Sequence, residues 1–130
     1  MYQIIFYKDE NGISEVEKYI KELRDKKENN KDSRIKYEKI DIYLNLLTKC
    51  GLRLGEPYIK HLEKDLWELR PLRDRIIFAH LEENNIILLT HFIKTTKKTP
   101  RKEIKRAYKL LKIVKEEIND ERKFWNLGRF

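Results

Sequence analysis

The spacing of apolar residues changes abruptly near residue 58, and this change constrains the fold more than any other feature. Between residues 13 and 50 the apolar side chains recur at the spacing of one helical face. From residue 58 to residue 93 the period is close to two, which is typical of strands. Residues 104–118 return to helical spacing. The chain must therefore pack helices against a sheet made mainly by its second half.

The first half is predicted to form one strand and two helices, over residues 2–7, 14–28 and 33–50. Ser14 and Glu17 have the spacing of a capping box. Asp32 or Ser33 can cap the second helix, and Gly51 accepts the left-handed conformation that ends it. Two helices with a short break between them form an antiparallel hairpin that can cover one face of a sheet.

The second half is predicted to form strands at about 58–62, 66–71, 73–81 and 86–94, with a turn at Asn84-Asn85. The first two segments are either separate strands or one bent strand. Counted as one strand, they give the order β-α-α-β-β-β-α. The continuous apolar run 86–89 favours a central strand buried on both faces. Thr99-Pro100 is a cap followed by a first helical residue. We therefore expect an α+β fold, a small and mainly antiparallel sheet with helices on one face.

Length and composition exclude several classes of protein. The 130 residues suit a single domain, predicted over residues 1–118, with a tail over 119–130 that either docks or stays loose. The aromatic and apolar residues of this tail are Phe124, Trp125, Leu127 and Phe130. The apolar runs are too short for a membrane span, and the first residues do not form a signal peptide. Cys50 is the single cysteine and the three histidines are scattered, so we expect a cytoplasmic protein without metal or cofactor.

The charge of the chain favours a polyanionic partner, which can be nucleic acid, an acidic protein or a membrane surface. The net charge is +8, and between residues 94 and 112 nine basic residues accompany one acid, Glu103. Three arginines stand within six residues of predicted strand, at 70, 73 and 75. If the strands over 73–81 and 86–94 pair as a hairpin, Arg73 and Arg75 meet Lys94 in space.

Strand alternation predicts which side chains share a face. It places Arg73, Arg75 and Ile77 on one face, opposite Ile76, Phe78 and His80. On the next strand it places His91 with Ile87, Leu89 and Ile93, so that His91 faces the core. Trp67 is interpreted either as a platform for an RNA base or as a core residue at the sheet edge.

Such a cationic cluster suits cleavage of RNA, in which the 2′-hydroxyl attacks the neighbouring phosphate and negative charge builds on its oxygens. Proton transfer needs an acid or a base, for which His91, His61 or a lysine with a lowered pKa are candidates. We predict catalytic roles for Arg70, Arg73, Arg75, Lys94 and His91, and RNA-binding roles for Lys60, Lys97, Lys98 and Arg101. The plainer interpretation is that the charges form a solvated face and that His91 is a core residue.

The strand sequences Leu66-Trp67-Glu68-Leu69-Arg70 and Arg73-Asp74-Arg75-Ile76-Ile77-Phe78 resemble the central strands of RelE/HigB-type toxins. The stretch from Ile86 to Lys94, followed by Lys97-Lys98-Thr99-Pro100 and Glu103-Ile104, is similar to the phage-derived HigB-like branch of type II toxin-antitoxin systems. The resemblance covers about residues 2–118.

The resemblance implies a metal-independent endoribonuclease that cleaves mRNA on the translating ribosome. It also implies a HigA-like helix-turn-helix antitoxin. The toxin would contact DNA only indirectly, through this antitoxin. The functional arginine of the family corresponds to Arg75 and the basic residues after the last strand to Lys94, Lys97 and Lys98; Arg70 and Lys60 match basic positions of the preceding strand. The chain departs from some relatives in having Ile104 near the position of a catalytic tyrosine, with Tyr108 one turn later. A non-catalytic nucleic-acid-binding module and a protein that binds an acidic partner are the alternatives.

Overall fold

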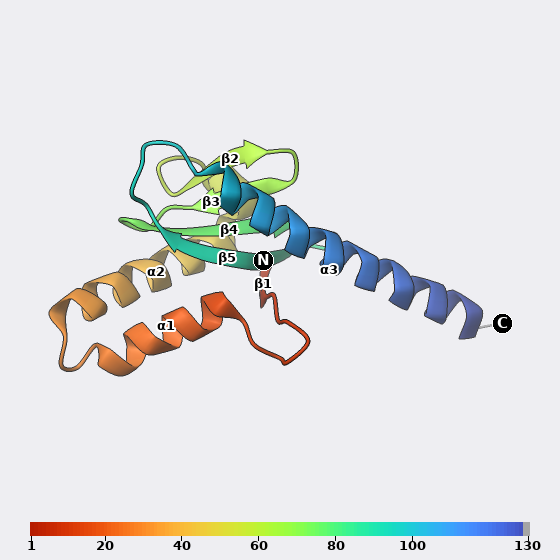
Figure 1. The fold of residues 1–130 in the computed structure, drawn as a ribbon, viewed down its shortest axis with the longest axis horizontal. Coiled ribbons are helices and arrows are strands. Elements are labelled where there is room, and N and C mark those ends of the chain that lie inside the picture. The colour runs from red at the N-terminus through yellow and green to blue at the C-terminus, as the bar shows by residue number, and fades with distance from the viewer. Residues whose placement is uncertain (129–130) are drawn as a thin grey trace.

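Five strands form one mixed sheet in the computed structural model, with helices on both of its faces (Figure 1). Along the chain the elements are β1 (Gln3–Phe6), α1 (Glu15–Lys26), α2 (Lys31–Cys50), the 3₁₀ helix η1 (Gly51–Leu54), β2 (Ile59–Glu63), β3 (Leu66–Leu69), β4 (Asp74–His80), β5 (Asn85–Ile93) and α3 (Arg101–Gly128). The structure describes the backbone of residues 1–128 and the side chains of residues 1–120. The side chains of the predicted tail, at 124, 125, 127 and 130, lie outside the described residues, while its backbone continues α3 to Gly128.

The sheet has the order β1-β5-β4-β3-β2, and only the pairing of β1 with β5 is parallel. The predicted α+β class and the mainly antiparallel sheet are thus confirmed. β2 and β3 are separate antiparallel strands, so the chain has one more strand than the predicted order counted. The expectation of helices on one face was wrong, because α1 and α2 cover one face and α3 crosses the other (Figure 1).

The two central strands explain why both faces need a cover. Ile76 and Phe78 of β4 belong to the core beneath α1 and α2, whereas Ile77 and Ala79 belong to the core beneath α3. The predicted central strand is confirmed in the same way, since β5 lies between β1 and β4 and residues 86–89 alternate between the two cores. Burial of such a strand on both sides removes most of its apolar surface from water.

A β-bulge in β5 reverses the expected alternation at the end of that strand. Ile77 pairs with Thr90 but Phe78 pairs with Leu88, so Leu89 is an extra residue in the ladder. His91 therefore pairs with Ile76 and lies on the face of α1, opposite to Leu89. The prediction that His91 shares a face with Ile87 and Leu89 was wrong for this reason.

The ends of the first two helices follow from their capping residues. Ser14 caps α1 as predicted, because its hydroxyl accepts a hydrogen bond from the Glu17 amide at 3.1 Å. Asn30, and not Asp32 or Ser33, caps α2, since its side-chain oxygen accepts a hydrogen bond of 2.9 Å from the Ser33 amide. Gly51 ends α2 at φ 59° as expected, and a Cβ there would collide with the ring of Tyr2.

Two later boundaries differ by about one residue from the prediction. The turn between β4 and β5 places Glu83 and Asn84 in the left-handed region, and Asn85 already belongs to β5. The carbonyl of Pro100 accepts the first amide bonds of α3, from Glu103 at 3.0 Å and Ile104 at 3.3 Å. The Thr99 hydroxyl is thereby free for a contact with the sheet. No described helix is both long and apolar enough to cross a membrane.

The outer edge of β5 is covered by side chains where β1 ends. β1 pairs only with residues 85–88. Beyond it the amide of His91 donates to Glu15 at 3.0 Å, and the carbonyl of His91 accepts from Arg106 at 3.3 Å. Arg106 also pairs with Glu15 and with Glu103. This network ties α1 and α3 to β5 and satisfies backbone groups that an open sheet edge would expose.

Candidate functional site

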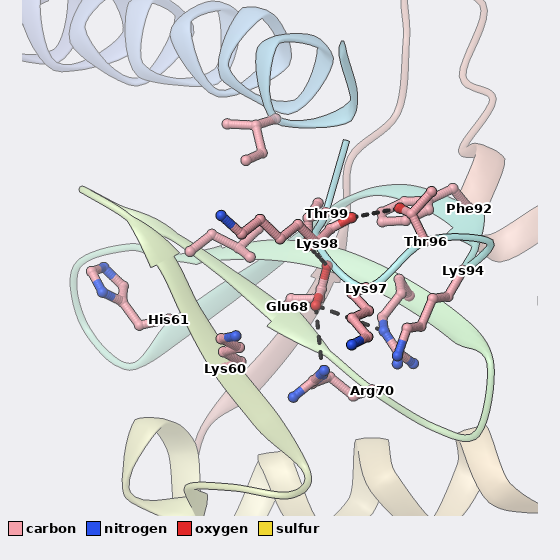
Figure 2. Close-up of a pocket in the computed structure, with 13 residues that line it drawn as sticks. Lys60, His61, Glu68, Arg70, Phe92, Lys94, Thr96, Lys97, Lys98 and Thr99 are labelled. Carbon is pink, nitrogen blue, oxygen red and sulfur yellow. Dashed lines mark hydrogen bonds and ion pairs between the residues drawn. The ribbon is translucent and has the colours of Figure 1, made fainter. Parts of the chain in front are cut away.

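A pocket of about 250 Å³ lies on the α3 side of the sheet, beneath the loop that joins β5 to α3 (Figure 2). We call it the basic pocket. Its lining residues are Lys60, His61, Leu62, Glu68, Arg70, Arg75, Phe92, Lys94, Thr96, Lys97, Lys98, Thr99 and Ile104. Six of the nine residues predicted for catalysis or RNA binding are among them, namely Lys60, Arg70, Arg75, Lys94, Lys97 and Lys98. The structure thus brings together basic residues from β2, from β4, from the position just after β3 and from the loop after β5.

Strand register accounts for this convergence. Lys60 pairs with Glu68, and Glu68 pairs with Ile77, whose side chain belongs to the core beneath α3. Residues directly opposite one another in a ladder point to the same face, so Lys60 and Glu68 both face the pocket. In the neighbouring row Arg75 pairs with Phe92. The loop after β5 then folds back over this surface and adds its lysines (Figure 2).

Glu68 is the centre of the pocket, although it was not among the predicted site residues. Its side chain is 2% exposed. One carboxylate oxygen lies 3.6 Å from Nε of Arg70 and 3.7 Å from Nε of Arg75. The other accepts a hydrogen bond of 2.6 Å from the Thr99 hydroxyl. A buried carboxylate requires such partners, and the signal in the sequence was a glutamate within an otherwise apolar strand.

Arg75 is held rigidly beside Glu68. Its Nη1 donates to the carbonyls of Leu72 and Asp74, both at 2.8 Å. Burial lowers the pKa of the Arg75 guanidinium and the Glu68 carboxylate opposes this change, so the group stays charged at neutral pH. Within the described part of the chain, Nη2 of Arg75 has no hydrogen-bond partner. One edge of a fixed guanidinium therefore remains available to a ligand.

Arg70 is less rigidly held. Its Nη1 lies 3.7 Å from a carboxylate oxygen of Glu56, an exposed residue. Its Nε is buried and has no hydrogen-bond partner among the described groups. Figure 2 shows Lys60, Lys97 and Arg70 grouped around Glu68. The single carboxylate faces six cationic side chains, so the pocket has a large excess of positive charge.

A second pocket of about 360 Å³ adjoins the first and contains Arg73. It is lined by Leu72, Arg73, Arg75, Lys94, Thr95, Thr96 and Lys97, four of which also line the basic pocket. The predicted meeting of Arg73 with Lys94 is confirmed. The Lys94 amide donates to the Arg73 carbonyl at 2.8 Å, and Nη2 of Arg73 donates to the Lys94 carbonyl at 3.1 Å.

His91 is not part of this site, because the bulge in β5 turns it to the opposite face. Its ring stacks on Tyr19 with centroids 3.8 Å apart, and its Nε2 lies 2.9 Å from Oδ1 of Asp74. The Tyr19 hydroxyl donates to the same oxygen at 2.7 Å. Burial alone would raise the pKa of the Asp74 carboxyl, but the bonds from His91 and Tyr19 outweigh it and lower that pKa. The Asp74 side chain therefore bonds His91 and Tyr19 on the other face of the sheet, while its charge also acts on Arg75 and raises the pKa of that guanidinium.

Three other polar candidates are directed elsewhere. Arg101 lies outside both pockets and pairs with Glu63 at 2.6 Å. His61 is at the margin of the basic pocket (Figure 2). Its ring lies 4.7 Å from the ring of Trp67 and its Nε2 is 2.8 Å from the Lys64 carbonyl. The Tyr108 hydroxyl donates to the Glu63 carbonyl at 3.3 Å. Trp67 is half-buried against the core beneath α1 and α2, which favours its interpretation as a core residue.

The arrangement is suited to hold a phosphate and to stabilise added negative charge on it. Charged donors that are already fixed in place need little reorganisation when such charge develops. The lining offers no histidine imidazole directed at the cations, and its carboxylate is occupied by ion pairs and by Thr99. Among the described residues, no group of three or more histidine, cysteine, aspartate or glutamate side chains is placed to hold a metal ion.

Comparison with known proteins gives one result that covers most of the chain. No curated protein matches the chain. The family model described as "Phage derived protein Gp49-like (DUF891)" matches residues 18–112, which extend from α1 into α3 and include every side chain of both pockets. The chain belongs to this family of phage-derived Gp49-like proteins.

Proposed function

We propose that the protein is a HigB-like toxin that cleaves mRNA on the ribosome without a metal. The observation that carries the proposal is the basic pocket, where a buried carboxylate holds Arg75 in place and leaves one edge of its guanidinium free. The resemblance of the strand sequences to HigB-like toxins and the membership of the phage-derived Gp49-like family support the same assignment.

In this proposal the scissile phosphate binds between Arg75 and Lys94, which both line the two pockets. The 2′-hydroxyl of the preceding ribose attacks the phosphorus and gives up its proton to water, and the 5′-oxygen of the next nucleotide leaves and takes up a proton from water. Nη2 of Arg75 and the Lys94 ammonium stabilise the charge that develops on the non-bridging oxygens. Lys60, Arg70, Lys97 and Lys98 bind the flanking phosphates.

The orientation of the histidines favours a second candidate function, a non-catalytic module that binds RNA or the ribosome. His91 lies on the other face of the sheet and the His61 ring lies against Trp67, so neither is aimed at the arginines. A binding module needs only phosphate contacts and no general acid or base. The two functions differ in whether bound RNA is cut.

The proposed partners are a HigA-like helix-turn-helix antitoxin and mRNA on the ribosome, in the cytoplasm. An antitoxin segment with acidic side chains would neutralise the basic pocket by covering it. A complex in which the antitoxin leaves Arg73, Arg75 and Lys94 fully open would contradict neutralisation by simple occlusion.

Induced expression in bacterial cells without the antitoxin tests the proposal, with growth and mapped mRNA 5′ ends as readouts. Wild type is compared with Arg75→Ala and with Lys94→Ala, because Arg75 also bonds the backbone and its loss can affect folding. Arg34→Ala, which removes an exposed arginine from α2, is the matched control. We expect growth arrest and new 5′ ends for wild type and Arg34→Ala, and loss of both for the site variants. Normal growth with soluble wild type and intact mRNA would instead support the binding module.

A further inference from the structure

Leu72 has a backbone conformation that leucine seldom adopts. Its φ is 57°, in the left-handed region where a Cβ crowds the neighbouring carbonyl and which favours glycine. The residue is nevertheless exposed, at 48% of its surface. Leu72 thus combines a backbone conformation that is unfavourable for leucine with an apolar side chain that is only partly covered. Such outliers concentrate where a side chain serves a ligand.

The conformation is fixed by the site itself. Leu72 lies in the turn before β4, closed by the hydrogen bond from the Asp74 amide to the Pro71 carbonyl at 3.0 Å. The Leu72 carbonyl accepts the 2.8 Å bond from Nη1 of Arg75. The guanidinium proposed to bind the scissile phosphate thus also holds Leu72 at the wall of the second pocket.

The lining of the second pocket has the chemistry of a nucleotide site. It contains four cations, Arg73, Arg75, Lys94 and Lys97, with two threonines, one leucine and no acidic residue. The cations suit a phosphate and the threonine hydroxyls suit a sugar. Leu72 adds the only apolar side chain of this lining, which suits the face of a base. An acidic peptide would use the cations equally well, but it has no need for a single apolar surface beside them.

The two pockets share Arg75, Lys94, Thr96 and Lys97, so occupants of both would be neighbours on one strand. We propose that the second pocket binds the nucleotide adjoining the phosphate held in the basic pocket, and that its base packs on Leu72. This inference rests on the proposed function and adds to it a subsite for one nucleotide of single-stranded RNA. Leu72 is assigned as a binding residue, and no catalytic role is implied.

Replacement by glycine tests the assignment because it removes the side chain and relieves the left-handed strain together. Asn84→Gly is the matched control, since Asn84 is also exposed and uncharged and has φ 64° in the turn at the other end of β4. A variant that binds less well while its unfolding midpoint does not fall cannot be explained by damage to the fold.

The measurement is fluorescence anisotropy of two probes with purified protein, a short oligouridylate and a ribose-phosphate oligomer of the same length without bases. We expect wild type and Asn84→Gly to bind the oligouridylate about fivefold more tightly than the abasic probe, as burial of part of one leucine against a base would give. Leu72→Gly should bind both probes equally, with unchanged affinity for the abasic one.

Other outcomes separate this inference from the proposed function. If Leu72→Gly keeps the full preference for the oligouridylate, the subsite is wrong although RNA binding stands. If Leu72→Gly keeps that preference and loses affinity only for the antitoxin, Leu72 serves a protein partner and the subsite is again wrong. If wild type and Lys94→Ala bind both probes equally weakly, the RNA-binding function itself is contradicted.

Discussion

The carboxylate of Glu68 lies 3.7 Å from Nε of Arg75, and both side chains are almost completely buried, at 2% and 7% exposure. Glu68 contacts the Nε side of the Arg75 guanidinium and two backbone carbonyls bind its Nη1. Within the described residues, only Nη2 therefore remains available to a ligand. The same carboxylate accepts a hydrogen bond from the Thr99 hydroxyl. The pocket floor and the start of α3 are therefore organised by one acidic residue.

Glu68→Gln should lower the free energy of unfolding by about 2 kcal/mol, because it leaves Arg70 and Arg75 without their buried counter-ion. Chemical denaturation measures this change. Glu63→Gln is the control, since its partner Arg101 is 60% exposed and the pair should contribute well under about 1 kcal/mol. Equal effects of the two substitutions would contradict the organising role of Glu68.

Thr99→Val should cost about 1.5 kcal/mol, because it keeps the shape of the side chain and removes the 2.6 Å hydrogen bond to a buried carboxylate. Thr96→Val removes an exposed hydroxyl whose bond is to the Lys98 carbonyl, and it should cost less. Urea unfolding of the two variants compares them directly. A neutral Thr99→Val would show that the loop is not fastened to the sheet through Glu68.

Asp74 should make stability depend on pH in acid. Its pKa is lowered in the folded protein below the ordinary 3.8, so its contribution is complete above about pH 4 and is lost as the pH falls through the folded pKa. His91 and Tyr19 bond the carboxylate and Lys36 acts on it through its charge. Asp74→Asn should be less stable than wild type at pH 7, and the difference should shrink below about pH 4.

The control for Asp74 is Asp65→Asn, which alters a carboxylate that is 59% exposed in its pair with Lys115. Its stability should follow that of wild type from pH 7 to acid. Thermal unfolding at several pH values in this range measures the stability of wild type and of both variants. A constant difference between wild type and Asp74→Asn at every pH would mean that the carboxylate charge does not contribute.

RNA binding should weaken with salt in proportion to the number of phosphate contacts. Lys97→Ala should reduce the slope of log affinity against log salt by about 0.7, the value for one contact to a single strand. Lys97 is exposed and lines both pockets, so the loss should not disturb the fold. Lys31→Ala, at the exposed start of α2, should leave the slope unchanged. Identical slopes for the two variants would exclude a phosphate contact at Lys97.

The hydrophobic pattern was sufficient to predict the elements and the meeting of Arg73 with Lys94, because periodicity and hairpin pairing depend on local sequence. It could not predict the face of His91. One extra residue at Leu89 reverses every later side chain of β5, and the apolar run 86–89 carries no mark of a bulge.

The carboxylate at the centre of the pocket was missed for a related reason. Glu68 reads as a surface residue in a short strand, and its burial depends on the loop around Thr99 returning over the sheet. The threonine was expected to cap α3, but its hydroxyl bonds the sheet and the Pro100 carbonyl begins the helix. Contacts between residues 31 apart in sequence are not contained in local patterns.

Whether the protein cuts mRNA on the ribosome can be measured by mapping RNA 5′ ends after purified protein is added to ribosomes translating a defined mRNA, with Lys94→Ala in parallel. We predict that wild type produces cleavages in register with the reading frame, that these disappear when initiation is blocked, and that Lys94→Ala produces few or none. Intact mRNA in the presence of wild-type protein that binds the ribosome would contradict cleavage, and would identify the basic pocket as a binding site alone.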